Sequence, residues 1–145
     1  MGRSHTTSLV FITMMFFAIS CTSTRGANGS DEELADLAQQ LGYVAVAVHG
    51  LVRFGNPPAD LTGEQLVIEA TKDNPALLNP LSGYFVAARR EGRLSSVLMC
   101  DIKRHHAVAE DAGCTSSRLD APLWQTSLDS PCSFTLDLWA ICGSK

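Results

Sequence analysis

The spacing of apolar residues changes several times along the chain, and each change predicts an element. Across 31–41, leucine and alanine recur every three or four positions, which indicates one apolar face of a helix. Ser30 and Glu33 have capping-box spacing, and Gly42 follows as a helix-ending residue. Residues 43–48 are then a continuous run of tyrosine, valine and alanine. That run predicts a strand that is covered on both faces.

A second helix is predicted after a proline-containing loop. Thr62 and Gln65 form another capping box at its start. We expect the helix to run to about residue 73, because the proline at position 75 disfavours helical backbone in the residue before it. The segment that follows contains proline, serine and glycine and is expected to be irregular.

The remaining patterns predict three strands and one short helix. Residues 84–90 and 94–102 are expected to pair as a hairpin, because the glycine at the centre of 91–93 suits a tight turn. A short helix is predicted over 105–112. A final strand is predicted over 133–141, where apolar residues alternate with polar ones.

These elements together define a fold class. After the first helix their order is strand, helix, strand, strand, helix, strand, which is the order of the ferredoxin-like fold. We therefore predict a single α+β domain over 30–145, with an antiparallel sheet of about four strands, helices on one face and stabilisation by disulfides. A fold of this kind hosts many unrelated functions, so it does not indicate one.

The first 20 residues have the pattern of a signal peptide. Arg3 provides a short basic start, and 9–19 is apolar except for one threonine. A transmembrane helix needs about 20 apolar residues, so this run is too short to be read as one. We therefore predict export, with 1–20 removed from the mature protein.

The sequence at 17–21, Phe-Ala-Ile-Ser-Cys, resembles the lipobox of bacterial lipoproteins. In that family cleavage occurs before an invariant cysteine, which carries the lipid. The resemblance implies that Cys21 is lipidated and that 21–29 is a short tether. It also implies a bacterial membrane location facing the periplasm or the cell surface. Ordinary cleavage after Ser20 is the alternative, and it would give a soluble secreted protein.

The number of cysteines agrees with lipidation. The chain has five, and assigning Cys21 to a lipid leaves an even set for an oxidising compartment: Cys100, Cys114, Cys132 and Cys142. Four cysteines allow three pairings, and the sequence does not choose among them. We expect a Cys114–Cys132 bridge, because it would close the long segment between these residues. Cys100 and Cys142 then form the natural second pair.

The segment between Cys114 and Cys132 is the least ordinary part of the sequence. It has no clear helical or strand pattern, and loops of this length are usually functional or held in place. Its interior carries an isolated apolar group, Leu119, Leu123 and Trp124, and one exposed tryptophan can dominate an interface. We therefore predict a partner-binding loop. Packing of Trp124 over the sheet is the structural alternative.

Charge argues against one class of function and indicates a second candidate surface. The chain has 11 basic and 15 acidic residues, and without Arg3 the mature part has 10 against 15, a net charge near −5. General nucleic-acid-binding proteins have the opposite balance. Basic residues nevertheless gather around the predicted hairpin, where they suit an acidic partner or phospholipid headgroups. These residues are Arg89, Arg90, Arg93, Lys103 and Arg104.

No catalytic motif is recognisable in the sequence. It contains no GxSxG elbow, HExxH pair, phosphate-binding glycine loop or dinucleotide fingerprint. The cysteines and the pair His105 and His106 are zinc-compatible, but their spacing does not match that of structural zinc sites. We therefore predict neither a metal nor a cofactor. Glu110 and Asp111 are interpreted as part of a solvated face.

Two main classes of function remain open, with a third behind them. The first is a non-enzymatic lipoprotein of the cell envelope that binds a protein partner, as an assembly factor, an inhibitor or an immunity-type protein. The second is a small exported hydrolase in which His49, His105 or His106 is paired with a carboxylate. The third is a structural component of the envelope that self-associates.

Overall fold

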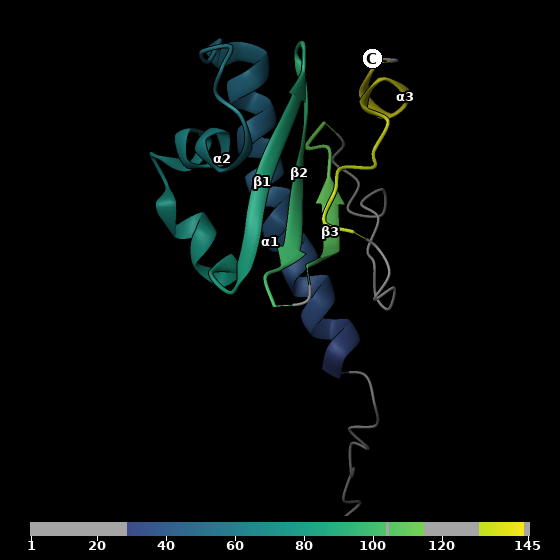
Figure 1. The fold of residues 1–145 in the computed structure, drawn as a ribbon. Coiled ribbons are helices and arrows are strands. Elements are labelled where there is room, and N and C mark those ends of the chain that lie inside the picture. Colours follow the sequence, from purple (N-terminus) through teal and green to yellow (C-terminus); the bar gives the residue numbers. More distant parts are fainter. Residues whose placement is uncertain (1–28, 104, 115–130, 144–145) are drawn as a thin grey trace, which may run out of the picture.

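The computed structural model describes residues 29–103, 105–114 and 131–143 (Figure 1). Its centre is a three-stranded antiparallel sheet in the order β1-β2-β3. The strands are β1 (Tyr84–Glu91), β2 (Leu94–Asp101) and β3 (His106–Asp111). The α+β class and the antiparallel sheet are therefore as predicted, but the described residues form three strands where about four were expected.

The predicted hairpin is confirmed. Strands β1 and β2 pair in register from Tyr84 opposite Asp101 to Glu91 opposite Leu94, which leaves a two-residue turn. Gly92 begins this turn with a φ of 61°, in the left-handed region that glycine adopts without steric cost.

The helix predicted over 105–112 is wrong, because these residues supply β3. Strand β3 pairs with β2, with a register shift between Met99 and Cys100. Ala107 and Ala109 are buried in this sheet. Alanine has a good helix propensity, but tertiary pairing overrides such preferences in a segment this short.

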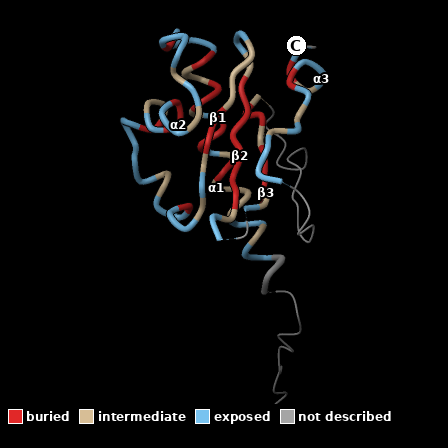
Figure 2. Tube along the Cα trace, in the orientation of Figure 1, coloured by how far each residue is buried: buried red, intermediate tan, exposed pale blue. Residues whose placement is uncertain are grey.

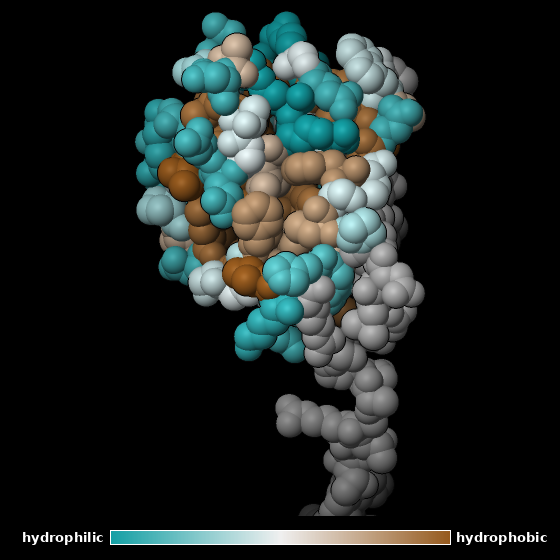
Figure 3. All heavy atoms as spheres, in the orientation of Figure 1, coloured by the Kyte–Doolittle hydropathy of each residue, from teal (hydrophilic) through white to brown (hydrophobic). Residues whose placement is uncertain are grey.

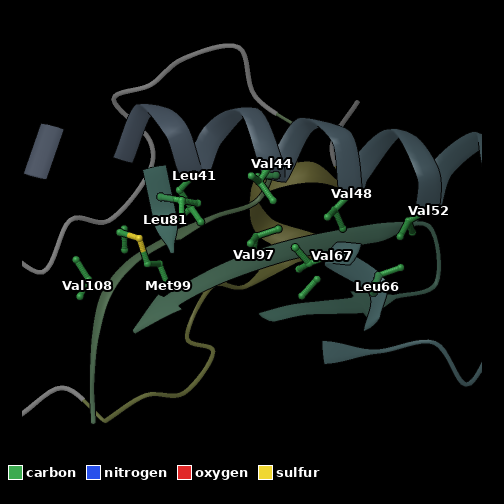
Figure 4. Packing of buried hydrophobic residues seen from close by; sticks show 13 residues of the cluster. Leu41, Val44, Val48, Val52, Leu66, Val67, Leu81, Val97, Met99 and Val108 are labelled. Atoms are coloured by element: carbon green, nitrogen blue, oxygen red, sulfur yellow. The ribbon is translucent and has the colours of Figure 1, made fainter. Parts of the chain in front are cut away.

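The strand predicted over 43–48 is also wrong. Helix α1 runs without a break from Gly29 to Gly50 and continues into a π-helical turn, η1 (Leu51–Gly55). Tyr43 and Val46 in this segment are exposed. The buried side chains recur every three or four positions and point toward the sheet (Figure 4): Leu41, Val44, Val48 and Val52. This spacing buries one stripe of a helix.

Helix α2 (Gly63–Thr71) confirms the second predicted helix, although it ends two residues early. Thr62 is the N-cap residue, but its side chain makes no capping hydrogen bond, so the predicted capping box does not form. A 3₁₀ helix, η2 (Pro75–Leu81), follows and leads into β1. The proline at position 75 therefore ends the α-helical region, as expected.

The main core lies between the sheet and helices α1 and α2. It unites Val44 and Val48 of α1, Leu66 of α2, and Val97 and Met99 of β2 (Figure 4). Figure 2 shows the same arrangement, with the buried positions concentrated in the strands and on the helix sides that face them. Within the described residues, no helix is both long and apolar enough to span a membrane.

The strand predicted over 133–141 is wrong. Residues 134–137 form neither helix nor strand, and they are followed by a short helix, α3 (Leu138–Cys142). Asp137 starts this helix, because its Oδ1 accepts hydrogen bonds from the backbone N–H groups of Trp139 and Ala140. The first and last predicted strands are both missing from the sheet, so the ferredoxin-like order does not describe this fold.

Residues 131–143 cover the face of the sheet opposite α1. Phe134 packs on Leu98 and Cys100 of β2, and Leu138 is fully buried in a neighbouring cluster. The sheet is therefore covered by helices on one face and by a C-terminal strap, defined here as residues 131–143, on the other.

Candidate functional site

A cavity of about 370 Å³ lies where the end of α1 meets the turn between β1 and β2. Its wall is formed by η1, by the loop at 56–57 and by the hairpin end. Three of the lining residues are arginines: Arg53, Arg90 and Arg93. We call this cavity the arginine pocket.

Two of these arginines are held in place by backbone carbonyl groups. Nη1 of Arg90 donates to the carbonyl oxygens of Pro57 and Pro58, both at 3.2 Å. Nη2 of Arg93 donates to the carbonyl oxygen of Arg53 at 2.6 Å. An arginine side chain has five N–H donors, so most of the donors of each group remain available for a ligand.

The third guanidinium group lies beside an aromatic ring. The Arg53 guanidinium carbon is 5.7 Å from the centroid of the Phe54 ring, within cation–π range. Phe54 is 78% exposed, the highest value among the large apolar residues described. The arginine pocket therefore has an exposed apolar surface at its rim.

Within the described residues, no carboxylate forms an ion pair with an arginine of the pocket. The ion pairs of the described residues are Lys72–Glu69 and Arg89–Glu91, and neither involves a pocket arginine. Three positive charges thus share one cavity in a chain that is acidic overall. Such a cavity attracts anionic groups and binds them with charge-assisted hydrogen bonds.

The positive charge of the arginine pocket affects the pKa of a buried histidine on α1. His49 is 8% exposed, and its Nδ1 has no hydrogen-bond partner among the residues that the structure describes. Its pKa lies below the ordinary value of 6.5, first because of burial and second because of the positive charge of Arg53. His49 is therefore an internal reporter of the electrostatic potential near Arg53.

A second polar cluster fixes the C-terminal strap. Glu110 is fully buried, although the sequence suggested a solvated face. Its Oε1 accepts a hydrogen bond from the Ser96 hydroxyl at 2.9 Å. Its Oε2 accepts from the backbone N–H groups of Thr135 at 2.8 Å and Leu136 at 3.2 Å, and from the Thr135 hydroxyl at 3.1 Å. Each carboxylate oxygen is engaged, so this group is a structural anchor.

Both disulfides also fasten the C-terminal strap. They join Cys100 to Cys132 and Cys114 to Cys142, with Cα–Cα distances of 5.8 and 5.9 Å. The four predicted cysteines are all paired, but both expected bridges, Cys114–Cys132 and Cys100–Cys142, are wrong. The strap lies along the sheet face that bears Cys100, which places Cys132 beside β2 and Cys142 beside the end of β3.

The predicted basic patch is divided among different parts of the molecule. Arg89 belongs to the strap face, where it donates to the carbonyl oxygen of Leu136 at 2.6 Å and lies over the Phe134 ring. Lys103 follows the opposite end of β2 from Arg93. Of the patch residues that the structure describes, only Arg90 and Arg93 come together in one site. Hydrophilic side chains crowd the end of the domain that carries the β1–β2 turn (Figure 3).

Several predicted positions lie outside the described residues. These are the lipidation residue Cys21, Arg104, and the apolar group Leu119, Leu123 and Trp124. Of the other histidines, His105 is exposed and His106 is half-buried on β3. No group of three potential metal-ligating side chains is found among the residues that the structure describes.

Sequence reasoning missed Arg53 and Phe54 as site residues. They lie in η1, just after α1, but they are about 40 positions from the hairpin whose arginines they join. Residues 43–48 were also predicted as a strand, so the helix that places Arg53 and Phe54 beside the hairpin was not recognised. The run Arg-Phe-Gly-Asn-Pro-Pro at 53–58 signals a loop but carries no sign of its distant neighbours.

Comparison with known proteins returns no match. No family model, no curated protein and no solved structure is similar to this chain. The arginine pocket is therefore the starting point for a functional proposal.

Proposed function

We propose that the protein is a non-enzymatic binding or accessory lipoprotein of the bacterial cell envelope, such as an assembly factor, an inhibitor or an immunity-type protein. It holds an acidic group of a protein partner in the arginine pocket. The observation that carries the proposal is the gathering of three guanidinium groups in one cavity, none of which forms an ion pair with a carboxylate of the described residues. Arginine forks of this kind suit carboxylates, which they bind with two parallel hydrogen bonds.

The position of the arginine pocket supports a partner in the aqueous space. A lipid on Cys21 would be eight residues from the start of α1 at Gly29, a reach of at most roughly 27 Å. Helix α1 has 22 residues and a length of about 33 Å. It begins at one end of the domain and ends beside the β1–β2 turn at the other (Figure 1). The pocket thus lies at the end remote from the tether, which favours a protein partner over the headgroups of the anchoring membrane.

The disulfides support export. Two bridges connect the C-terminal strap to the rest of the domain, and such bonds persist in oxidising compartments. Their use of four cysteines leaves Cys21 as the odd one, in agreement with the lipobox resemblance. Export and lipidation are parts of the proposal and are tested below.

The arrangement of the histidines favours binding over hydrolysis. A hydrolase would need a histidine oriented by a carboxylate. Within the described residues, no carboxylate is hydrogen-bonded to His49, and Nδ1 of His49 and of His106 has no partner. A binding role therefore explains the observed contacts better than a histidine–carboxylate enzyme does.

The anchor is tested by replacing Cys21 with serine in a bacterial host. We expect the wild-type chain in the membrane fraction, with an intact mass that includes a diacylglyceryl group. The Cys21→Ser chain should be soluble, because a pair of acyl chains contributes roughly 0.8 kcal/mol per buried CH₂. Equal membrane association of both chains would refute the lipid anchor.

The partner is tested by site-specific photo-crosslinking in intact cells. A photoreactive residue at Asn56, which lines the arginine pocket, should capture a defined envelope protein. The cross-link should disappear in Arg53→Gln and Arg93→Gln chains and persist in Lys103→Ala, since Lys103 lies at the other end of β2. Undiminished cross-linking in both arginine variants would exclude the arginine pocket as the binding site.

A further inference from the structure

We infer that the arginine pocket binds an acidic peptide segment in which carboxylate side chains flank an apolar one. This inference rests on the proposed binding function and specifies its ligand. The ligand class follows from the joint presence of guanidinium groups, an exposed aromatic ring and a cavity larger than a single anion.

The size of the cavity argues for more than a small inorganic anion. Its volume of about 370 Å³ is many times the roughly 10 to 15 Å³ that a cavity needs to hold one water. One carboxylate or phosphate group would occupy a fraction of this space. The remainder has room for a side chain and a stretch of backbone, and the volume falls in the range of sites that take organic ligands.

The charges set the number of acidic groups. Three guanidinium groups that form no ion pair within the described part of the chain are best neutralised by two or three carboxylates. The carbonyl hydrogen bonds of Arg90 and Arg93 hold both side chains in place before a ligand arrives. Less side-chain entropy is then lost on binding, so the available donors contribute more fully to affinity.

The rim of the arginine pocket provides the apolar and amide contacts. Phe54 exposes its ring beside the Arg53 guanidinium, so an apolar ligand side chain can pack on the ring while a neighbouring carboxylate binds the arginine. Asn56 also lines the pocket, and its side-chain amide can both donate to and accept from a peptide backbone. An inorganic anion would leave the ring and this amide unused.

The experiment measures the fluorescence anisotropy of a labelled Glu-Glu-Phe-Glu-Glu peptide with the oxidised protein. A Gln-Gln-Phe-Gln-Gln peptide should bind at least about tenfold more weakly, because it lacks the charges. A Glu-Glu-Gly-Glu-Glu peptide should bind about threefold to tenfold more weakly, because it lacks the apolar contact. Affinity for the charged peptides should fall as the salt concentration is raised from about 50 to about 200 mM, because salt screens the attraction between the charges.

Matched protein variants assign these effects to individual side chains. Arg53→Gln and Arg93→Gln should each lower affinity by about tenfold. Phe54→Ala should weaken binding of the phenylalanine peptide and leave the glycine peptide unchanged, which is the signature of a direct pair in a double-mutant cycle. Lys103→Ala and Phe85→Ala remove a cation and an exposed ring elsewhere on the domain and should have no effect.

The pKa of His49 gives an independent measure of ligand binding at Arg53. A purely structural role of the pocket arginines would not make this pKa change when the ligand is added. Binding of a carboxylate at Arg53 offsets the positive charge that lowers the His49 pKa. The pKa measured by NMR should therefore rise when the charged peptide is added and stay constant with the glutamine peptide. No rise on saturation with the charged peptide would place the ligand away from Arg53.

Three results would overturn the inference. Inorganic phosphate that displaces the peptide at equal concentration would identify a small-oxyanion site instead. Equal binding of the charged and glutamine peptides would exclude charge recognition. Concentration-dependent self-association that is abolished by Glu32→Gln with Glu33→Gln would identify the acidic start of α1 in a second copy as the occupant. Each result is independent of the Cys21→Ser fractionation, so failure of the ligand class and failure of the anchor are distinguishable.

Discussion

Gly113 lies directly against the carbonyl group of Ala45, so that the end of β3 meets the backbone of α1. A Cβ atom at position 113 would be 2.2 Å from the Ala45 oxygen. Gly113 also has a φ of 65°, in the left-handed region. Sterics and backbone conformation therefore both require glycine at this contact.

We predict that Gly113→Ala destabilises the domain by more than about 3 kcal/mol, because helix and strand must separate to admit the methyl group. Gly92→Ala is the control, since Gly92 has a similar φ of 61° but open space around it. That variant should cost about 1 kcal/mol from backbone strain alone. Urea denaturation measures the free energy of unfolding of both variants. An equal decrease in the two would show that the close contact with Ala45 does not contribute to stability.

Glu110 should be among the most sensitive polar positions. We expect Glu110→Ala to lower the free energy of unfolding by about 3 kcal/mol or more. It leaves the Ser96 hydroxyl and the N–H groups of Thr135 and Leu136 without their acceptor. Glu64→Ala, at an exposed site in the first turn of α2, should cost less than about 1 kcal/mol. Comparable midpoints for the two variants in urea would contradict the anchor role of Glu110.

The disulfide pairing can be checked directly by peptide mapping of the unreduced protein. We expect fragments that link Cys100 to Cys132 and Cys114 to Cys142. Replacing either pair by serine should cost about 3.5 kcal/mol in the chain-entropy estimate, because the linked residues are 32 and 28 positions apart. A fragment that joins Cys114 to Cys132 would contradict the fold of the strap.

The domain should lose stability in mild acid through His49. The folded-state pKa of His49 lies below its ordinary value of 6.5, so the unfolded chain binds more protons between these two values. This contribution to stability is complete above about pH 6.5 and is lost as the pH falls through the folded-state pKa. Thermal melting between pH 7.5 and 5 should therefore show a smaller pH dependence in His49→Gln. An equal pH dependence in the wild-type and His49→Gln chains would contradict this role of His49.

The sequence was most informative where the cause of structure is local. The turn at Gly92 depends on a φ that glycine adopts readily, and the hairpin on either side of it was predicted with nearly correct bounds. The end of α2 before Pro75 has a similar local cause, a steric clash between proline and the preceding residue. Prediction succeeded at these points because no distant residue is needed to specify the backbone.

Prediction failed where distant contacts decide between helix and strand. Val44 and Val48 suit a strand by propensity, but they also have the spacing of one helical face, and the sheet that buries them begins about 40 residues later. Gly42 was expected to end the helix, yet a Cβ there would make only ordinary contact with Asp111. Because the helix continues past Gly42 into η1, it places Arg53 in the arginine pocket. This continuation was not predicted, so only part of the site could be inferred from the sequence.

The two bridges alternate along the chain, since Cys114 lies between Cys100 and Cys132, and Cys132 lies between Cys114 and Cys142. A protease that cuts once between Cys114 and Cys132 therefore produces two fragments, each of which holds one half of both disulfides. The cleaved protein would gain the mass of one water, and its two fragments would stay linked until a reductant broke both disulfides. After a cut between Cys114 and Cys132, the two parts of the domain are therefore held together covalently by the disulfides alone, and only as long as the surroundings are oxidising.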